Sequence, residues 1–235
     1  MKQMGKLFRI GMKQISRDGM LLVLIPAPFL VGIFFKFAIP FMDHLLTEQL
    51  AFSIAPWYGL ADGMLLCLTP MFVAMISAFL LLEERDEGIS AFYQITPSEG
   101  YAYLGARIGM PMLWAFAASL IVAGAFNLSS LSWPVIVAGA LIGSLTGIFL
   151  ALMVAGLAGN RVEGLAVSKL MGISFLGLIL IWFIPAPYHY LMAFLPSFWV
   201  GKLLMDGGNI LTLAGGTGVC FLWIAVFSRL FLKKV

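Results

Sequence analysis

The chain has 235 residues, of which 62% are hydrophobic and 11% are charged, and its formal net charge is +3 at pH 7. Soluble domains have roughly 45–50% apolar and 25% charged residues, so the composition excludes a soluble domain and indicates a protein that crosses a membrane several times. The small positive charge arises from basic residues near the membrane surface and does not favour nucleic acid as a partner.

The first predicted element is an amphipathic helix over residues 1–18. At about 100° per residue, its basic side chains gather on one face, opposite an apolar face. The basic residues are Lys2, Lys6, Arg9, Lys13 and Arg17. Such a helix lies in the membrane interface, with its basic face toward anionic lipid or an acidic protein surface. The same residues also fit a simple positive flank of the first membrane span.

Six apolar runs are long enough to cross the bilayer as helices, since a crossing needs about 20 apolar residues. They lie at residues 21–41, 61–82, 109–126, 134–158, 166–184 and 210–232. The first run is too long for a cleaved signal peptide, so we expect it to remain as a helix. Continuously apolar runs do not fit the alternating strands of a β-barrel. The predicted fold class is therefore an all-α integral membrane protein, with residues 19–235 as a six-helix transmembrane domain.

The basic residues also predict the orientation of the chain. If the spans alternate in direction, all lysine and arginine residues except Lys36 and Lys202 fall on one side. Because positively charged loops stay in the cytoplasm, we expect a multi-pass protein of the cell membrane with both termini cytoplasmic.

A charged block lies between the second and third spans, on the side expected to be cytoplasmic. It begins with the run Glu83, Glu84, Arg85, Asp86 and Glu87. Gly88 then allows a change of direction. Thr96 and Pro97, with a glutamate at the third helical position, form a capping box that predicts the start of a long third helix below the membrane.

The short apolar run 89–95 lies between these two signals and is predicted to form a linking helix. Phe92 and Tyr93 lie in this tight elbow, where a solvated loop has no need of aromatic side chains. The run fits a knob that docks on a partner, and it equally fits a segment that dips into lipid.

The fourth span carries a stripe of small residues at every fourth position. Its members are Gly139, Gly143, Gly147, Ala151, Ala155 and Gly159. Small residues let helix backbones approach closely in a membrane, so this helix is predicted to pack along its length against another. The neighbour could belong to the same chain or to a second copy.

The segment 185–208 before the sixth span is too broken for a crossing and too apolar for a solvated loop. We expect short interfacial or re-entrant helices divided at Pro196, with Lys202 and Asp206 paired at i, i+4. Prolines also fall within the first three spans, at Pro26, Pro28, Pro40, Pro70 and Pro111. They fit kinked helices around a pathway, or the ordinary tolerance of membrane helices for proline.

At these residues the chain resembles the permease subunits of ABC-2 type transporters. The matching features are the basic amphipathic N-terminal helix, the E-x-x-x-E-G run that ends at Gly88, the Thr96–Pro97 pair and the broken segment before the last span. The resemblance covers the layout of nearly the whole chain. In size and layout the chain also resembles the small permeases that export drugs or peptide antibiotics.

The resemblance implies a membrane subunit that pairs with a second permease, the same chain or a homologue, and with two cytoplasmic ABC ATPase subunits. It also implies that the linking helix docks on the ATPase. The implied coupling residues are Glu83, Glu84, Arg85, Asp86, Glu87, Gly88, Phe92, Tyr93, Thr96 and Pro97. The chain has no G-x-x-x-x-G-K-[ST] motif, so we expect it to bind no cofactor itself, with ATP and Mg²⁺ held by the partner.

Two other classes of function remain open from the sequence: a membrane sensor or immunity protein, and a lipid-modifying membrane enzyme. An enzyme needs a nucleophile with its base, a carboxylate pair or metal ligands, yet the only histidines are His44 and His189, both expected at the surface. Few charges lie at membrane depth, which disfavours an ion-driven carrier. We therefore expect an exporter of hydrophobic or amphiphilic compounds whose energy comes from another subunit.

Overall fold

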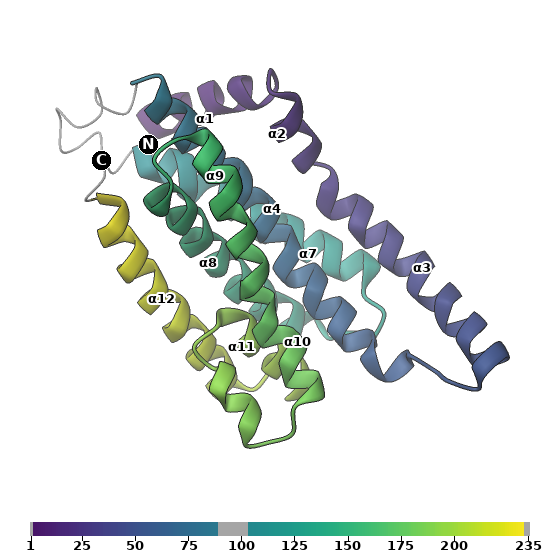
Figure 1. Cartoon of the computed structure of the whole chain (residues 1–235). Coiled ribbons are helices and arrows are strands. Elements are labelled where there is room, and N and C mark those ends of the chain that lie inside the picture. Colours follow the sequence, from purple (N-terminus) through teal and green to yellow (C-terminus); the bar gives the residue numbers. More distant parts are fainter. Residues whose placement is uncertain (1, 89–102, 233–235) are drawn as a thin grey trace.

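The computed structural model describes residues 2–88 and 103–232. Within these ranges the chain forms helices and connecting loops, and no residue there belongs to a strand. Six helical segments are long and apolar enough to cross a membrane, which confirms the predicted fold class. Figure 1 shows them as a tilted bundle, with α1 lying across one end. We call this end the α1 end of the bundle.

The helices follow one another along the chain with short connections. Their bounds are α1 Lys2–Ile15, α2 Gly19–Leu24, α3 Ala27–Leu50, η1 Ala55–Trp57, α4 Tyr58–Asp86, the π-helical turn η2 Gly105–Gly109, α7 Met110–Phe126, α8 Trp133–Leu157, α9 Arg161–Ser168, η3 Lys169–Phe175, α10 Leu176–Phe183, η4 Tyr188–Met192, α11 Pro196–Met205 and α12 Ile210–Leu232. The six spans are α2–α3, η1–α4, η2–α7, α8, α9–η3–α10 and α12.

The first span is longer than the predicted run 21–41, because α3 continues to Leu50. Its polar end is tied down by Asp43, whose carboxylate accepts hydrogen bonds from the Ile54 N–H at 2.7 Å and the Tyr58 hydroxyl at 2.8 Å. The predicted run stopped just before Asp43, whereas the helix continues past this residue, whose charge is satisfied by these hydrogen bonds.

The centre of the bundle is formed by α4 and α8. Their most apolar windows are 78% and 72% buried, against 11% for the α2–α3 span and 17% for α12. The two outer helices therefore expose most of their apolar surface. Figure 1 shows α3 diverging from the other spans toward the end opposite α1.

The small-residue stripe of α8 lies against α4 of the same chain. A Cβ atom placed on Gly143 would lie 2.6 Å from the Leu66 carbonyl oxygen, and one on Gly147 would lie 3.1 Å from the Pro70 carbonyl oxygen. A side chain on Gly139 would likewise meet the Leu66 side chain. The closest neighbour of these glycines is thus intramolecular.

The far end of the stripe needs correction. Ala151 and Ala155 are fully buried, but α8 ends at Leu157, so Gly159 lies in the following loop. The Gly159 N–H donates a 2.6 Å hydrogen bond to Glu163 Oε2 at the start of α9. Gly159 therefore belongs to a turn and not to a helix-packing surface.

The broken segment before the last span forms η4 and α11, and α11 begins at Pro196 as predicted. Phe198, Val200 and Leu203 are fully buried, so α11 packs inside the bundle between α8, α10 and α12. Lys202 Nζ and Asp206 Oδ1 lie 3.0 Å apart, which confirms the predicted pair.

The two histidines differ in their surroundings. His44 is exposed as expected, but the expectation for His189 is wrong, because its side chain is buried. It packs against the rings of Tyr190 and Phe198, and its Nδ1 lies 3.2 Å from the Ile184 carbonyl oxygen. His189 is a packing residue of the turn that contains η4.

Candidate coupling site

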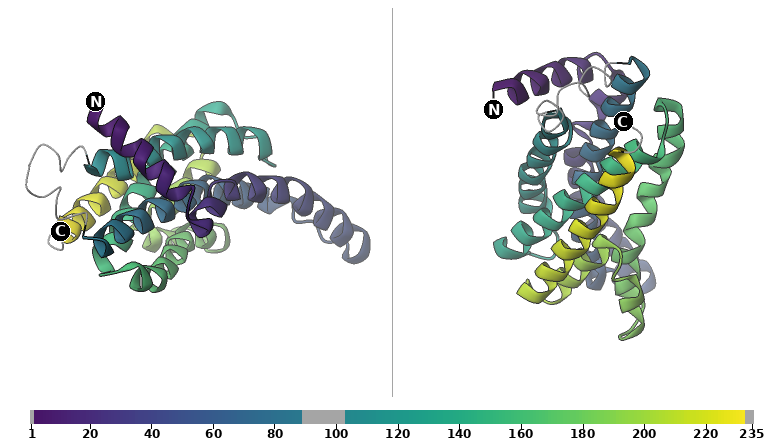
Figure 2. Two further views of the ribbon diagram at one scale, coloured as in Figure 1. Left: turned by 90° about the horizontal axis from the view of Figure 1, so that it is seen from above. Right: turned by 90° about the vertical axis from the view of Figure 1, so that its left-hand side faces the viewer.

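The charged run 83–88 lies at the α1 end of the bundle, in the last turns of α4 and just beyond them. Successive residues of a helix point in different directions, so a run of charges reaches several neighbours at once. Figure 2 shows the ends of α4, α8 and α12 and the start of α9 gathered on this side. We call Glu83, Glu84, Arg85 and Asp86 the hub of α4.

Glu84 points into the bundle and pairs with Arg107, in the π-helical turn that precedes α7. Both residues are only 1% exposed. Arg107 donates to both carboxylate oxygens, with Nε 3.0 Å from Oε2 and Nη2 close to Oε1. The Tyr103 hydroxyl donates a further 2.7 Å hydrogen bond to Oε2. This buried pair therefore fixes the foot of α7 to the end of α4.

The amphipathic helix α1 covers the same pair from outside. Arg107 Nη2 lies 3.5 Å from Gln14 Oε1, and a side chain on Gly11 would collide with the guanidinium group. Ile15 at the end of α1 is buried with Leu21 and Phe79. Helix α1 is thus held on the bundle by both polar and apolar contacts.

Arg85 connects the hub to two further helices. Its Nη1 donates hydrogen bonds of 2.9 Å to the carbonyl oxygens of Ala155 and Ala158, which lie at the end of α8. The guanidinium carbon also lies 5.6 Å from the centre of the Phe231 ring in α12. Carbonyl groups in the last turn of a helix lack partners within the helix, so a cation there is favourable.

Arg161, the first residue of α9, gathers three carboxylates around it. Its side chain pairs with Asp18, and its Nη1 lies 3.5 Å from Glu83 Oε2. Its backbone N–H donates a 3.0 Å hydrogen bond to Asp86 Oδ2. The start of α9 is therefore joined to the end of α4 and to the turn before α2.

Asp18 has a second role as the cap of α2, where its carboxylate accepts the N–H groups of Met20 and Leu21. Partial burial opposes its ionisation, but the hydrogen bond from Arg161 and those from the backbone outweigh this effect and lower its pKa. Asp18 is therefore a carboxylate at neutral pH and can hold Arg161.

Glu87 and Gly88 are the last described residues of the predicted coupling element, and both are exposed. Gly88 has a φ of 72°, a left-handed conformation that suits glycine and turns the chain away from α4. The other predicted coupling residues, Phe92, Tyr93, Thr96 and Pro97, lie outside the described residues, as does the predicted linking helix.

The structure divides the acidic run into side chains that face inward and side chains that face solvent. Glu84 is buried, so its surface is not available to a partner in this arrangement, whereas Glu87 is exposed. Sequence reasoning missed the partners Tyr103, Arg107 and Asp18. The signal for Arg107 was its place at the start of an apolar span, where an ionisable residue usually has a partner.

Residues 11–228 match the protein family described as "Fluoroquinolones export permease protein Rv2686c-like". The chain is also similar to two proteins of Mycobacterium tuberculosis: the fluoroquinolones export permease proteins MT2760, of strain CDC 1551 / Oshkosh, and Rv2686c, of strain ATCC 25618 / H37Rv. Each is 26% identical over 192 residues, which cover 79% of this chain and 75% of the relative. No solved structure matches the chain. These matches favour a permease over a sensor, an immunity protein or a lipid-modifying enzyme.

Proposed function

Because the chain belongs to the Rv2686c-like family of fluoroquinolones export permease proteins, we propose that it is driven by separate ATP-hydrolysing subunits. The chain is a membrane permease, and ATP and Mg²⁺ would be bound by its partners. A second permease, either the same chain or a homologue, would complete the pathway. The α1 end of the bundle would face the cytoplasm, where the lysine and arginine residues favour its retention.

The observation that carries the proposal is the position of the hub. It ends the helix that leads into the predicted linking segment, and its side chains contact the ends of α7, α8, α9 and α12. Arg161 of α9 in turn pairs with Asp18 in the turn before α2. An ATPase that pushes on the linking segment would therefore move these helix ends together. These hydrogen bonds and ion pairs fix the helix ends in defined positions, so they would transmit a movement of α4 to the other helices.

We propose an amphiphilic compound of the fluoroquinolone class as the substrate, on the strength of what the relatives are named for. The exposed apolar faces of the α2–α3 span and α12 support a route between two permeases, since these helices are the least covered by their own chain. A lipophilic cargo could enter such a route from the membrane.

Replacing Glu87 by lysine is expected to abolish binding of the ATPase while the protein still inserts into the membrane. Glu87 is exposed beside the linking segment, so reversing its charge changes the docking surface without disturbing the buried contacts. Phe92→Asp should have the same effect if the linking segment docks through its aromatic side chains. The measurement is co-purification of the ATPase with the tagged permease from membranes that contain both.

The matched control is Glu48→Lys, which makes the same change on an exposed residue at the opposite end of the bundle. It should leave co-purification unchanged. Undiminished recovery of the ATPase with both Glu87→Lys and Phe92→Asp would contradict the coupling assignment. Loss with the Glu48 variant alone would place the ATPase on the other side of the membrane.

A further inference from the structure

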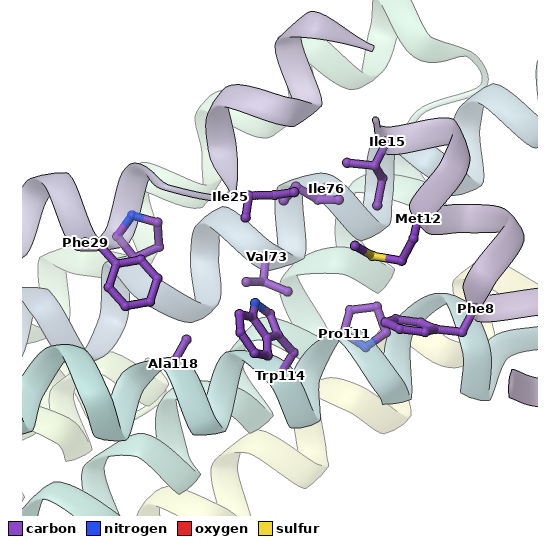
Figure 3. A pocket seen from close by; sticks show the side chains of 11 residues that line it. Phe8, Met12, Ile15, Ile25, Phe29, Val73, Ile76, Pro111, Trp114 and Ala118 are labelled. Carbon is purple, nitrogen blue, oxygen red and sulfur yellow. The ribbon is translucent and has the colours of Figure 1, made fainter. Parts of the chain in front are cut away.

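An apolar pocket of about 270 Å³ lies between α1 and the α3, α4 and α7 helices. Figure 3 shows Phe8, Met12 and Ile15 of α1 to the right of it, and Pro111, Trp114 and Ala118 of α7 along its lower side. Apart from the ring nitrogens of proline and tryptophan, the side chains around it carry no polar atoms. The pocket thus suits a hydrocarbon ligand and offers little to a strongly polar one.

The pocket extends along one face of α7 in the direction of the bilayer centre. Pro111, Trp114 and Ala118 repeat at three- and four-residue spacing, so they share one face of α7 and span about 10 Å along its axis. One leaflet of the hydrocarbon core is about 15 Å thick. A pocket that begins beneath an interfacial helix and runs this far reaches toward the middle of the leaflet.

The rim of the pocket opens toward lipid. Trp114 is 51% exposed, and the neighbouring residues Leu113 on α7 and Leu30 on α3 are 67% and 60% exposed. Large apolar side chains exposed in this way on a membrane span face acyl chains and not water. A lipid tail can therefore enter from the side without crossing a polar barrier.

Exposed basic residues of α1 follow two of the residues that line the pocket. Arg9 and Lys13 each follow a residue that lines it, namely Phe8 and Met12, and both are exposed. Arg17 is also exposed in the turn after α1. The acidic residue next to it, Asp18, is already paired with Arg161. Exposed basic side chains of an interfacial helix attract anionic headgroups.

We propose that this pocket is a binding site for one acyl chain of an anionic phospholipid, whose phosphate group lies against Arg9 and Lys13. The lipid would fill the space between α1, α3 and α7. The headgroup preference and the competition measured below distinguish this lipid from a substrate molecule.

The test uses tryptophan fluorescence of the full chain in phosphatidylcholine vesicles that contain a small fraction of lipid with brominated acyl chains. Bromine quenches tryptophan only at close range, and the difference between the wild type and Trp114→Phe isolates the quenching of Trp114. We expect brominated phosphatidylglycerol to quench Trp114 at an about 30-fold lower mole fraction than brominated phosphatidylcholine, the preference that two basic residues near an anionic lipid supply. High salt should reduce this preference.

Two sets of variants locate the effect. Arg9→Gln with Lys13→Gln should remove the preference for phosphatidylglycerol without disturbing the fold, whereas Arg229→Gln, which changes an exposed basic residue at the end of α12, should retain it. Ala118→Phe should weaken quenching by both lipids, because the added ring occupies the pocket.

Equal quenching of Trp114 by the two brominated lipids in the wild type would overturn the proposal, since ordinary boundary lipid would explain it. Quenching that a fluoroquinolone abolishes, with no headgroup preference, would assign the pocket to the substrate. A Trp114 that neither lipid quenches would mean that protein covers the pocket.

Discussion

Glu84→Ala is expected to destabilise the protein by about 3–5 kcal/mol, because it leaves the Arg107 guanidinium buried without its carboxylate. The loss is large beside the 5–15 kcal/mol or so by which folded proteins are usually stable. Tyr103 would lose its acceptor on Glu84 at the same time. Thermal unfolding in detergent micelles measures the effect. Glu87→Ala serves as the control, because Glu87 is exposed.

A double variant separates folding from coupling. Removing both charges with Glu84→Met and Arg107→Met should recover most of the lost stability, since replacing a whole buried ion pair by apolar side chains is often neutral. If the pair also transmits movement from α4 to α7, ATP-driven transport should stay impaired although the protein folds. A double variant that transports normally would reduce the pair to a structural contact, and a Glu84→Ala protein as stable as Glu87→Ala would contradict its burial.

Gly143→Val is expected to have the second largest effect, because it forces apart the two central helices. The new Cβ would lie 2.6 Å from the backbone oxygen of Leu66, which cannot rotate away as a side chain can. Overpacking of this kind costs about 1–3 kcal/mol. The unfolding temperature in detergent should fall, and the protein should become more sensitive to protease.

The control for this variant is Gly218→Val on α12, where an added Cβ meets nothing within 4 Å. It makes the same change of residue in a membrane helix and should leave stability nearly unchanged. If the two variants unfold alike, the close contact between α4 and α8 does not exist in the membrane. If Gly143→Val lowers stability only when copies of the chain associate, the stripe packs between subunits.

The spans and the broken helix α11 could be predicted because their signals are local. Apolar runs of membrane length fix the number of crossings, and Pro196 fixes where α11 begins. The ends of the helices were less predictable. Helix α3 continues to Leu50, past Asp43, whose carboxylate is satisfied by the Ile54 N–H of the following loop. Gly159 continued the spacing of the stripe but falls after the end of α8.

The charged run shows what a sequence pattern leaves open. It indicated that residues 83–88 matter, but not that Glu84 would turn inward while Glu87 stays in solvent. That division depends on which helix ends lie beside each face of α4. Arg107, the partner of Glu84, and Arg161, the partner of Glu83, are distant from α4 in the sequence. His189 was misjudged for the same reason, because the rings that bury it come together only in the folded turn.

The most direct test of the account is transport in vesicles that contain the purified permease with or without its ATPase. We expect ATP-dependent movement of a fluoroquinolone only when both proteins and ATP are present, and we expect Glu87→Lys, but not Glu48→Lys, to prevent it. Movement of the drug by the permease alone, driven by a proton or sodium gradient, would contradict the claim that this chain is moved by another subunit.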